Sequence, residues 1–533
     1  MPARILSGED GHKGGPVWRI AHGFFAAMLM LGMVLVAGAG SANATQRAGG
    51  PASDPAVLAS VPHATVTGPV TGGQGINLIG TTSFNLGTVG YEQNEYFLSG
   101  TATAYTSATR LTSNGRWKVT PESTAPYKTR MVVYRPINPK RFNGTVVVEW
   151  LNVSGGVDAA AAWLTDHVQM LRSGVVYVGV SAQAGGIVGE AGSLGASGGQ
   201  AGGIKGSDPT RYGSLEHPGD TYSYSIFEQA GAAIRSRAGL VLGGLQPKRV
   251  LALGESQSAS RLVTYIAALQ PQTHGVYDGY FVYSRGGSGA ALSEAPQPAI
   301  NPPTPTLIRT DLNVPVMMFE TEADVLVLGY LPARQPPTQF IREWEVAGTA
   351  HYDSYGLGQS MTDTGNGTGD VATFDTMINP VSSFDNGAIS CPVPFNAGAH
   401  TYELRAAMVA LNNWVITGTP PPQSPRLDVA SPSSYATDQN GEAVGGIRTP
   451  QVAAPIAIVN GTGDTSNAGG GFCKIFGLTT PFNSAKLAQL YPTHQAFVSK
   501  WDQAVAADVS KGYLLPADAA VLDRVANQST IGG

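Results

Sequence analysis

Ser256 lies between an apolar run that predicts a buried strand and a run that predicts a helix. The strand is expected at 250–253 and the helix at about 257–269. Residues 254–258 read Gly-Glu-Ser-Gln-Ser, the pattern G-x-S-x-G with Ser258 in place of the second glycine. In that pattern a sharp turn from strand to helix holds a serine hydroxyl above a parallel sheet, where it can attack a carbonyl carbon. The match is short enough to occur by chance, so other residues must support it.

A serine nucleophile needs a histidine to accept its proton and a carboxylate to orient that histidine. In proteins with this pattern both follow the serine, and the acid precedes the histidine. His351 directly follows a strand expected at 340–347 and is the predicted base. His400 precedes an expected helix and can either cap it or line a pocket. His494 lies in a polar helix, where exposure to solvent is expected.

The acid is expected in the loop that leaves the strand at 314–319, which carries Glu320, Glu322 and Asp324. Asp324 is the predicted acid, because the apolar residues after it can hold a short carboxylate rigidly against an imidazole. Glu322 is the alternative acid, since its longer side chain starts earlier in the same loop. The remaining interpretation is that these carboxylates only solvate the loop.

An oxyanion formed at the carbonyl needs two N–H donors. One is expected from the backbone of Gln257, which follows Ser256 at a helix N-terminus where the helix dipole also favours negative charge. The other is expected from the glycine-containing loop 151–156, with the backbone of Asn152 as the predicted donor. A side-chain bond from Asn152 or Ser154 is a second option, and a plain turn without this role is a third.

Strands and helices alternate over the middle of the chain, which predicts an open, mostly parallel α/β sheet with helices on both faces. Two strands near the start, at 95–105 and 130–135, suit antiparallel positions at the edge of the sheet. The expected later strands are 146–150, 175–180, 250–253, 279–284, 314–319 and 340–347. The expected helices are 157–171, 222–240, 257–269, 401–416 and 484–509.

The domain organisation is predicted from shifts in composition. Residues 45–90 are expected to form a linker or loose N-terminal arm, and 91–530 a single α/β domain. Stretches rich in Gly, Pro and Asn predict insertions at 184–220, 355–400 and 418–480, of which 184–206 is expected to be a long flexible loop. Because pockets of open α/β folds form at the carboxyl edge of the sheet, these insertions are expected to cover that edge.

The overall composition excludes several classes of function. Only 13% of the 533 residues are charged, 42% are hydrophobic, and the chain contains 68 Gly and 36 Pro, as in a loop-rich globular protein. The formal net charge is −5 and no basic run exists, so a nucleic-acid partner is not expected. The Gly-rich stretch lacks the pattern G-x-x-x-x-G-K-[ST], so a nucleotide phosphate loop is not expected either.

The first 44 residues predict a signal peptide. They combine basic residues, an apolar stretch at 24–37 and Ala42-Asn43-Ala44, which fits the small-x-small rule for cleavage. The chain is therefore expected to be secreted or periplasmic, with an uncleaved membrane anchor as the alternative. No later stretch reaches the roughly 18 apolar residues that a membrane span needs, so no stable span is expected after cleavage.

Cys391 and Cys473 are the only two cysteines. In an exported protein, two cysteines most simply form one disulfide bond. Two buried free thiols are the alternative. Two cysteines do not provide the set of ligands that a structural zinc site requires.

Taken together, the segments 142–156, 217–224, 254–262 and 347–351 resemble the large uncharacterised α/β-hydrolase-domain family of bacteria and fungi. They include Val-Val-Val-Glu-Trp-Leu-Asn-Val-Ser-Gly-Gly, the Gly-Glu-Ser-Gln-Ser-Ala-Ser-Arg-Leu elbow and Ala-Gly-Thr-Ala-His. The resemblance covers about 90–525. It implies the α/β-hydrolase fold and an ester hydrolase that uses a serine, and it implies no particular substrate.

The resulting hypothesis is an exported serine hydrolase that cleaves a small-molecule or polymeric carboxylic ester without a cofactor or metal. Ser256 is expected to attack the ester carbonyl, His351 to take the proton and Asp324 to orient the imidazole. The N–H groups of Gln257 and Asn152 are expected to receive the oxyanion, and water to release the acyl group. The alternatives are an acyltransferase that uses the same serine and a non-catalytic binding module on the same fold.

Overall fold

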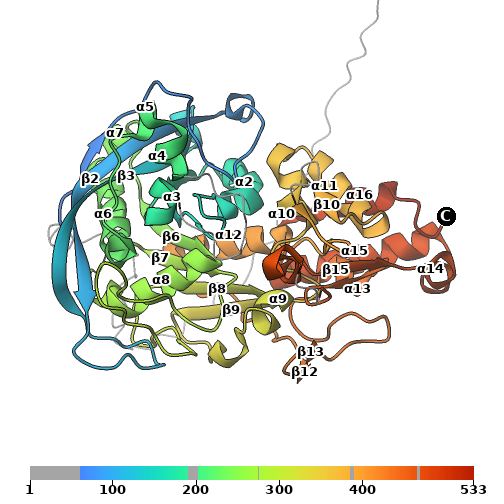
Figure 1. Ribbon diagram of the computed structural model, residues 1–533. Coiled ribbons are helices and arrows are strands. Elements are labelled where there is room, and N and C mark those ends of the chain that lie inside the picture. The colour runs from blue at the N-terminus through green and yellow to red at the C-terminus, as the bar shows by residue number, and fades with distance from the viewer. Residues whose placement is uncertain (1–60, 190–201, 274, 385–388, 465–467) are drawn as a thin grey trace, which may run out of the picture. The chain divides into compact units, whose positions relative to one another are not determined.

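The computed structural model contains one large sheet of nine strands, in the order β1-β2-β3-β5-β4-β6-β7-β8-β9 (Figure 1). It describes residues 61–189, 202–273, 275–384, 389–464 and 468–533, all within the compact unit Ala48–Gly533. The strands of the large sheet are β1 Thr65–Thr67, β2 Tyr91–Thr106, β3 Thr120–Pro136, β4 Thr145–Trp150, β5 Val176–Val180, β6 Arg249–Glu255, β7 Gly279–Tyr283, β8 Val316–Thr321 and β9 Ile341–Val346.

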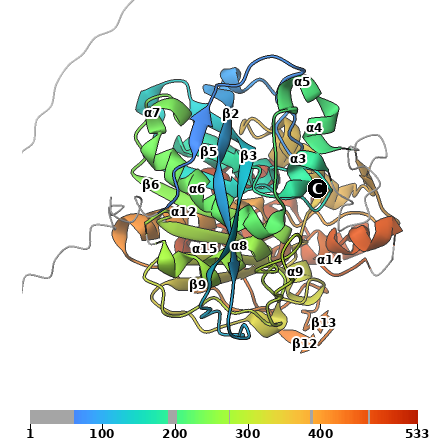
Figure 2. The same cartoon turned by 60° about the vertical axis from the view of Figure 1, so that its left-hand side comes forward.

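The strands from β5 to β9 in this order run parallel to their neighbours, while β1, β2 and β3 are antiparallel at one edge. This confirms the predicted fold class. β2 and β3 form a long hairpin, and the two strands lie side by side in both views (Figures 1 and 2). β3 begins ten residues before the predicted start at 130, because its first half is mostly exposed and so lacks a strong apolar pattern.

Apolar side chains of the parallel strands alternate between two cores. In β6, Val250 and Ala252 belong to the core that contains helices α6 and α8, whereas Leu251 and Leu253 belong to the core that contains α2 and α12. Side chains of a strand point alternately to opposite faces, so both faces of the sheet are covered. The four helices that cover them are α2 Ala161–Ser173, α6 Ser223–Ser236, α8 Gln257–Ala268 and α12 Thr401–Thr417.

Shorter elements occupy the connections and the predicted insertions. The short helices are α3 Ala184–Val188, α4 Gly203–Ser207, α5 Pro209–Tyr212, α7 Ala238–Val241, α9 Glu322–Leu326, α10 Ser354–Leu357, α11 Thr368–Ile378 and α13 Pro450–Ala453. The two-stranded sheets are β10 Ser383–Phe384 with β11 Ile389–Ser390, β12 Val429–Ser431 with β13 Ser434–Tyr435, and β14 Ala457–Asn460 with β15 Leu478–Pro481. The prediction of a continuous loop at 184–206 was therefore wrong at both ends, where α3 and α4 form.

The predicted N-terminal arm, 45–90, is part of the fold over the residues that the structure describes. β1 pairs with β2, and the backbone of Ile79 exchanges hydrogen bonds with the segment 158–160. The linker prediction was wrong for 61–90, because side chains distant in the sequence hold this segment. Arg211 donates to the carbonyls of Val70 and Gly72, and Arg130 donates to that of Asn77. The predicted signal peptide lies outside the described residues. Among the described residues, no helix is both long and apolar enough to cross a membrane.

The helix predicted at 484–509 is two helices. α14 Ser484–Leu490 ends before Pro492, and α15 His494–Lys511 begins after it. Proline lacks the N–H that a continuous helix requires, and its ring clashes with the preceding turn. α15 and the last helix, α16 Pro516–Gln528, pack on a third apolar cluster that includes Phe497 and Trp501.

Cys391 and Cys473 form a disulfide bond, as predicted. The bond joins the insertion at 355–400 to the insertion at 418–480. Both sulfurs belong to a small apolar cluster with Leu357, Phe395 and Phe476. Two long surface segments are therefore fixed to each other through a shared apolar patch and one covalent bond.

Thiol titration of the denatured, unreduced protein is expected to detect no free thiol. Replacement of both Cys391 and Cys473 by Ser is expected to lower the free energy of unfolding by up to about 4 kcal/mol, because the unfolded chain regains the freedom of a large loop. Denaturant titration of the two proteins measures this difference. Two titratable thiols in the wild-type protein would contradict the prediction.

Candidate active site

Ser256 lies at a sharp turn between the last residue of β6 and the first residue of α8. Its backbone has φ 55° and ψ −115°, a left-handed conformation that costs a residue with a side chain about 1–3 kcal/mol. Gly254 permits the close approach of strand and helix, because a Cβ at this position would lie 2.6 Å from the carbonyl oxygen of Ser258. The backbone therefore has the strained strand-to-helix turn that the sequence predicts.

Ser258 occupies the position of the second glycine in the pattern G-x-S-x-G, and its contacts show why a serine fits there. Its hydroxyl accepts a hydrogen bond from the N–H of Glu255 at 3.0 Å and donates to the carbonyl of Glu255 at 2.8 Å. The Ser258 side chain therefore joins the first turn of α8 to the backbone that precedes Ser256. Sequence reasoning treats this position only as one that must be small, whereas the structure gives its hydroxyl two partners.

His351 links Ser256 to Asp324. Its Nε2 lies 2.9 Å from the hydroxyl of Ser256, and its Nδ1 lies 2.6 Å from Oδ1 of Asp324. His351 and Asp324 are buried, and the other carboxylate oxygen of Asp324 accepts the N–H of Thr321 at 2.6 Å. Thr321 in turn accepts the N–H of Asp324, which makes a capping box at the start of α9. The carboxylate is thus fixed by its own helix before it contacts the imidazole.

Glu322, the alternative acid, does not contact His351. Its two carboxylate oxygens accept the N–H groups of Gly348 at 2.6 Å and Gly461 at 2.8 Å. Burial raises the pKa of Glu322 to about 7, although these two hydrogen bonds oppose the change. Glu322 therefore holds the loop that leads from β9 to His351 and connects it to the segment after β14.

Of the two predicted oxyanion donors, only Gln257 has a free backbone N–H. It stands at the first position of α8 and has no acceptor among the residues that the structure describes. The structure contradicts the assignment of Asn152, because its N–H donates to the carbonyl of Ala159 at 3.0 Å. The loop closes on itself as a short antiparallel bridge between these two residues. The N–H groups of Val153 and Gly155 in the same loop have no acceptor within the described part of the chain.

Asn152 contacts the site through its side chain instead. Its amide nitrogen donates to Oε2 of Glu255 at 2.9 Å and to the carbonyl of Glu255 at 3.1 Å. Its amide oxygen accepts the N–H of Ser154 at 2.7 Å. Asn152 therefore fixes both the loop after β4 and the residue that precedes Ser256.

Glu255 is a site residue that sequence reasoning missed, although it stands at the first x of G-x-S-x-G. Its side chain is buried, and Oε1 lies 3.5 Å from Nε2 of His351. Burial raises the pKa of Glu255 to about 7, and His351 acts in the opposite direction. Burial also lowers the pKa of His351, but the carboxylates of Asp324 and Glu255 together outweigh it, so this pKa lies above its ordinary value of 6.5.

A pocket of about 420 Å³ opens above Ser256 and His351. Apolar residues of the N-terminal segment and of α2 line this pocket. Residues of both insertions that the disulfide bond joins line it as well. The apolar residues of the pocket include Ile79, Leu164, Leu357, Met361, Ile389, Phe472, Ile475 and Phe476.

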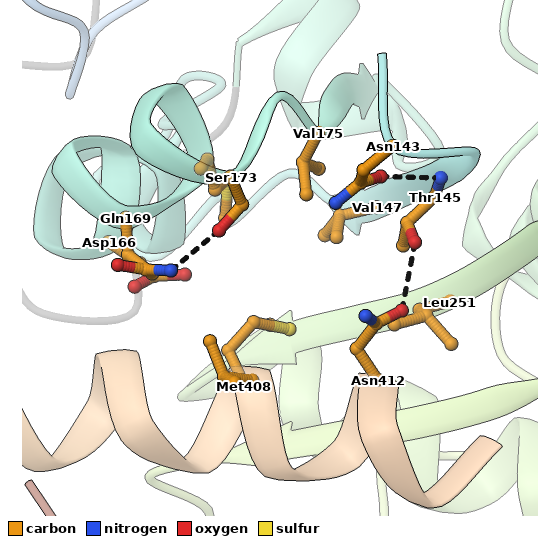
Figure 3. Close-up of a pocket in the computed structure, with 12 residues that line it drawn as sticks. Asn143, Thr145, Val147, Asp166, Gln169, Ser173, Val175, Leu251, Met408 and Asn412 are labelled. Carbon is orange, nitrogen blue, oxygen red and sulfur yellow. Dashed lines mark hydrogen bonds between the residues drawn. The ribbon is translucent and has the colours of Figure 1, made fainter. Parts of the chain in front are cut away.

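A second cavity lies at the opposite end of β4 and β6, next to Thr145, Asp166 and Asn412 (Figure 3). Its volume of about 30 Å³ leaves room for about one or two water molecules. It contains neither Ser256 nor His351, so the larger pocket is the candidate active site.

A model of the family described as Alpha/beta hydrolase domain matches residues 66–524. The chain belongs to this α/β-hydrolase family. The comparison with curated protein sequences gives no match. The strand order and the strained serine turn agree with membership of the family, and the segments that carried the resemblance can now be explained in its fold.

Several solved esterase structures show weak similarity to this α/β-hydrolase. They include a fungal esterase from Rhizomucor miehei (11% identity, TM-score 0.23, covering 46% of this chain and 74% of the other). Esterase Est22 has 12% identity, a TM-score of 0.26 and coverage of 49% and 73%. The rice cell wall degrading esterase LipA from Xanthomonas oryzae has 15% identity, a TM-score of 0.20 and coverage of 36% and 43%. Identities and TM-scores this low assign no activity to this chain.

Asp220 and Glu149, from two of the segments that carry the resemblance, support the site without lining it. Asp220 accepts the N–H of Ala184 at 2.7 Å and contacts Arg261 of α8 at 2.9 Å. Glu149, near the end of β4, accepts the N–H groups of Ala162 and Trp163 at 2.9 and 3.1 Å. Glu149 therefore caps α2, whose own N-cap residue provides no side-chain acceptor.

The other two histidine candidates lie away from Ser256. His400 is buried at the start of α12, with Nδ1 at 2.9 Å from Asp353 and Nε2 bonded to the hydroxyl of Tyr283. It precedes the helix as expected but is not among the residues that line the pocket. His494 is half-buried at the start of α15, with Nδ1 2.9 Å from the carbonyl oxygen of Ile531 and Nε2 3.2 Å from that of Asn527.

Proposed function

We propose that this protein is a serine hydrolase that cleaves carboxylic esters through an acyl-enzyme. The observation that carries the proposal is the continuous chain of contacts from Ser256 through His351 to Asp324, at 2.9 and 2.6 Å. It lies at the base of a pocket that is open to a substrate. A buried imidazole between a hydroxyl and a carboxylate is suited to proton transfer from that hydroxyl.

In the proposed reaction, His351 takes the proton of Ser256 as the serine oxygen forms a bond to the ester carbonyl carbon. The carbonyl oxygen becomes an oxyanion and accepts the N–H of Gln257, with Val153 or Gly155 as the second donor. The bond to the alcohol oxygen then breaks, and His351 returns its proton to the departing alcohol. A water molecule, deprotonated by His351, attacks the acyl-serine and releases the acid and the free hydroxyl.

Asp324 is proposed to hold His351 with its proton on Nδ1, which leaves Nε2 free to accept the proton of Ser256. The capping box at the start of α9 fixes Asp324 for this task. Glu322 is proposed to act only by holding the loop before His351 through Gly348. We therefore keep Asp324 as the proposed acid in preference to Glu322. The distance of 2.6 Å between Asp324 Oδ1 and His351 Nδ1 supports this choice.

Export is proposed as well. The signal peptide predicted at 1–44 and the disulfide bond between Cys391 and Cys473 both suit an oxidising compartment. The proposed site of action is therefore secreted or periplasmic.

Replacement of Ser256 by Ala is expected to lower ester turnover by a factor on the order of 10⁶, because the nucleophile is lost. A fluorophosphonate probe is expected to label the wild-type protein and not the variant. Steady-state kinetics with p-nitrophenyl acetate and mass spectrometry of the labelled protein provide the two measurements. Retention of more than a few per cent of the rate by a folded variant would show that Ser256 is not the nucleophile.

Replacement of Asp324 by Asn is expected to lower turnover by about 10⁴, because the amide stabilises the wrong tautomer of His351. Replacement of Glu322 by Gln is expected to lower it only about tenfold, as for a residue that supports the site from outside. Both variants replace a buried carboxyl group by an amide of the same size on the same short segment, so each controls for the other. The opposite order of effects would make Glu322 the acid.

Replacement of Glu255 by Gln is expected to shift the acid limb of the kcat/KM profile to lower pH. His351 must be neutral to act as a base, and its pKa lies above 6.5 in the protein. A negative charge beside an imidazole favours the protonated form, so removal of that charge lowers the pKa of His351.

Gln retains the size of Glu255 and can still accept the hydrogen bond from Asn152. The pH profile of the wild-type protein is the reference, and it reports Glu255 and His351 as a coupled pair. An unchanged acid limb in the Gln variant would show that Glu255 does not influence the protonation of His351.

A further inference from the structure

One wall of the pocket is made by segments that are far apart in the sequence. Ile389 comes from the insertion at 355–400, and Phe472, Ile475 and Phe476 come from the insertion at 418–480. Ile389 lies two residues before Cys391, and Phe472 lies next to Cys473, so the disulfide bond joins the two halves of the wall. We call these four residues the disulfide wall.

The disulfide wall has a rigid aromatic support behind it. The rings of Phe472 and Phe476 meet edge to face with centroids 4.6 Å apart, and Phe476 meets Phe395 in the same way at 5.6 Å. Phe395 also stacks on Phe384 at 5.5 Å. Phe395 and Phe476 are buried, whereas Phe472 is only half-buried and forms part of the pocket surface. Phe472 is therefore the aromatic face that this cluster presents to a bound molecule.

The described lining of the pocket is unfavourable for an anionic substrate. No lysine or arginine is found among the described residues that line it, and its carboxylate, Glu255, is next to Ser256. The apolar residues Ile79, Leu164 and Met361 also line the pocket. A carboxylate on the substrate would lose its hydration against these apolar side chains, which is costly in an apolar site.

We propose that the disulfide wall is an apolar subsite that binds an uncharged, ring-sized group of the ester and thereby sets substrate selectivity. This inference rests on the proposed ester hydrolysis. A volume of about 420 Å³ accommodates such a group together with the ester bond at Ser256. The disulfide bond keeps Ile389 and Phe472 together on one surface, so the selectivity depends on this bond as well as on the aromatic side chain.

The test compares Phe472→Ala with Phe384→Ala, a matched control from the same aromatic cluster that does not line the pocket. Four esters are used with a pH-stat: methyl acetate, phenyl acetate, methyl benzoate and the anion of monomethyl phthalate. Phenyl acetate and methyl benzoate place the ring on the alcohol and on the acyl side, respectively. The wild-type protein is expected to hydrolyse the phthalate at least tenfold more slowly than methyl benzoate.

Phe472→Ala is expected to lower kcat/KM for at least one ring-bearing ester about tenfold relative to methyl acetate, because a lost apolar contact has an effect of this size. Phe384→Ala is expected to leave that ratio within about twofold. If Phe472→Ala lowered kcat/KM equally for all four esters, the proposed subsite would be wrong. It would also be wrong if both variants changed the ratio of kcat/KM between the ring-bearing ester and methyl acetate by the same factor. If the wild-type protein preferred the anionic phthalate ester to methyl benzoate, the proposal that the subsite binds an uncharged group would be wrong.

The double replacement of Cys391 and Cys473 by Ser tests the disulfide bond. It is expected to reduce the preference for the ring-bearing ester in the same direction as Phe472→Ala, while the rate with methyl acetate changes less. An unchanged preference in the folded double variant would overturn the part of the proposal that concerns the disulfide bond.

Fluorophosphonate labelling of Ser256 separates failure of this inference from failure of the proposed function. A variant that is labelled and hydrolyses methyl acetate, but keeps the wild-type preference, contradicts only the subsite. A wild-type protein that is neither labelled nor active on any ester contradicts the proposed function itself.

Discussion

The short hydrogen bond between His351 and Asp324 is the contact on which the site depends. It joins the loops that follow β8 and β9, which are neighbouring parallel strands and therefore end at the same edge of the sheet. A buried carboxylate is costly unless it is hydrogen-bonded, and Asp324 and Glu322 each have hydrogen-bond partners for both oxygens. Asp324 is held by its own helix, and Glu322 is held by Gly348 and Gly461. Because a buried carboxylate needs these hydrogen bonds, they fix the positions of the loops that donate them.

Residues with a local signature could be predicted from the sequence. Ser256 lies between a strand and a helix, and His351 directly follows a strand, so apolar patterns alone locate both at the carboxyl edge of the sheet. Asp324 could be favoured over Glu322 because the apolar residues after it indicate a rigid segment. The parallel sheet was predictable for the same reason, since buried parallel strands are apolar without interruption.

Residues whose role depends on loop closure could not be predicted. The N–H of Asn152 is consumed by Ala159, and only the folded loop brings these two together. Glu255 gives no sequence signal, because its significance comes from a distance of 3.5 Å to His351 across the sheet edge. The same limit applies to 61–90, which β1 and the distant side chains of Arg130 and Arg211 tie to the rest of the fold. By contrast, the helix break at Pro492 was present in the sequence as an ordinary proline signal.

The loop after β4 is held in place by buried ion pairs, which position it beside Ser256 but add little to the stability of the fold. Arg130 of β3 contacts Asp158 of this loop at 3.0 Å and Glu95 of β2 at 3.1 Å, and Arg211 adds a second contact to Glu95 at 2.7 Å. A buried ion pair contributes little net stability, yet removal of one partner typically costs about 3–5 kcal/mol. Asp158 precedes Ala159, which closes the loop on Asn152. We therefore interpret this buried ion network as the part of the fold that sets the loop in place beside Ser256.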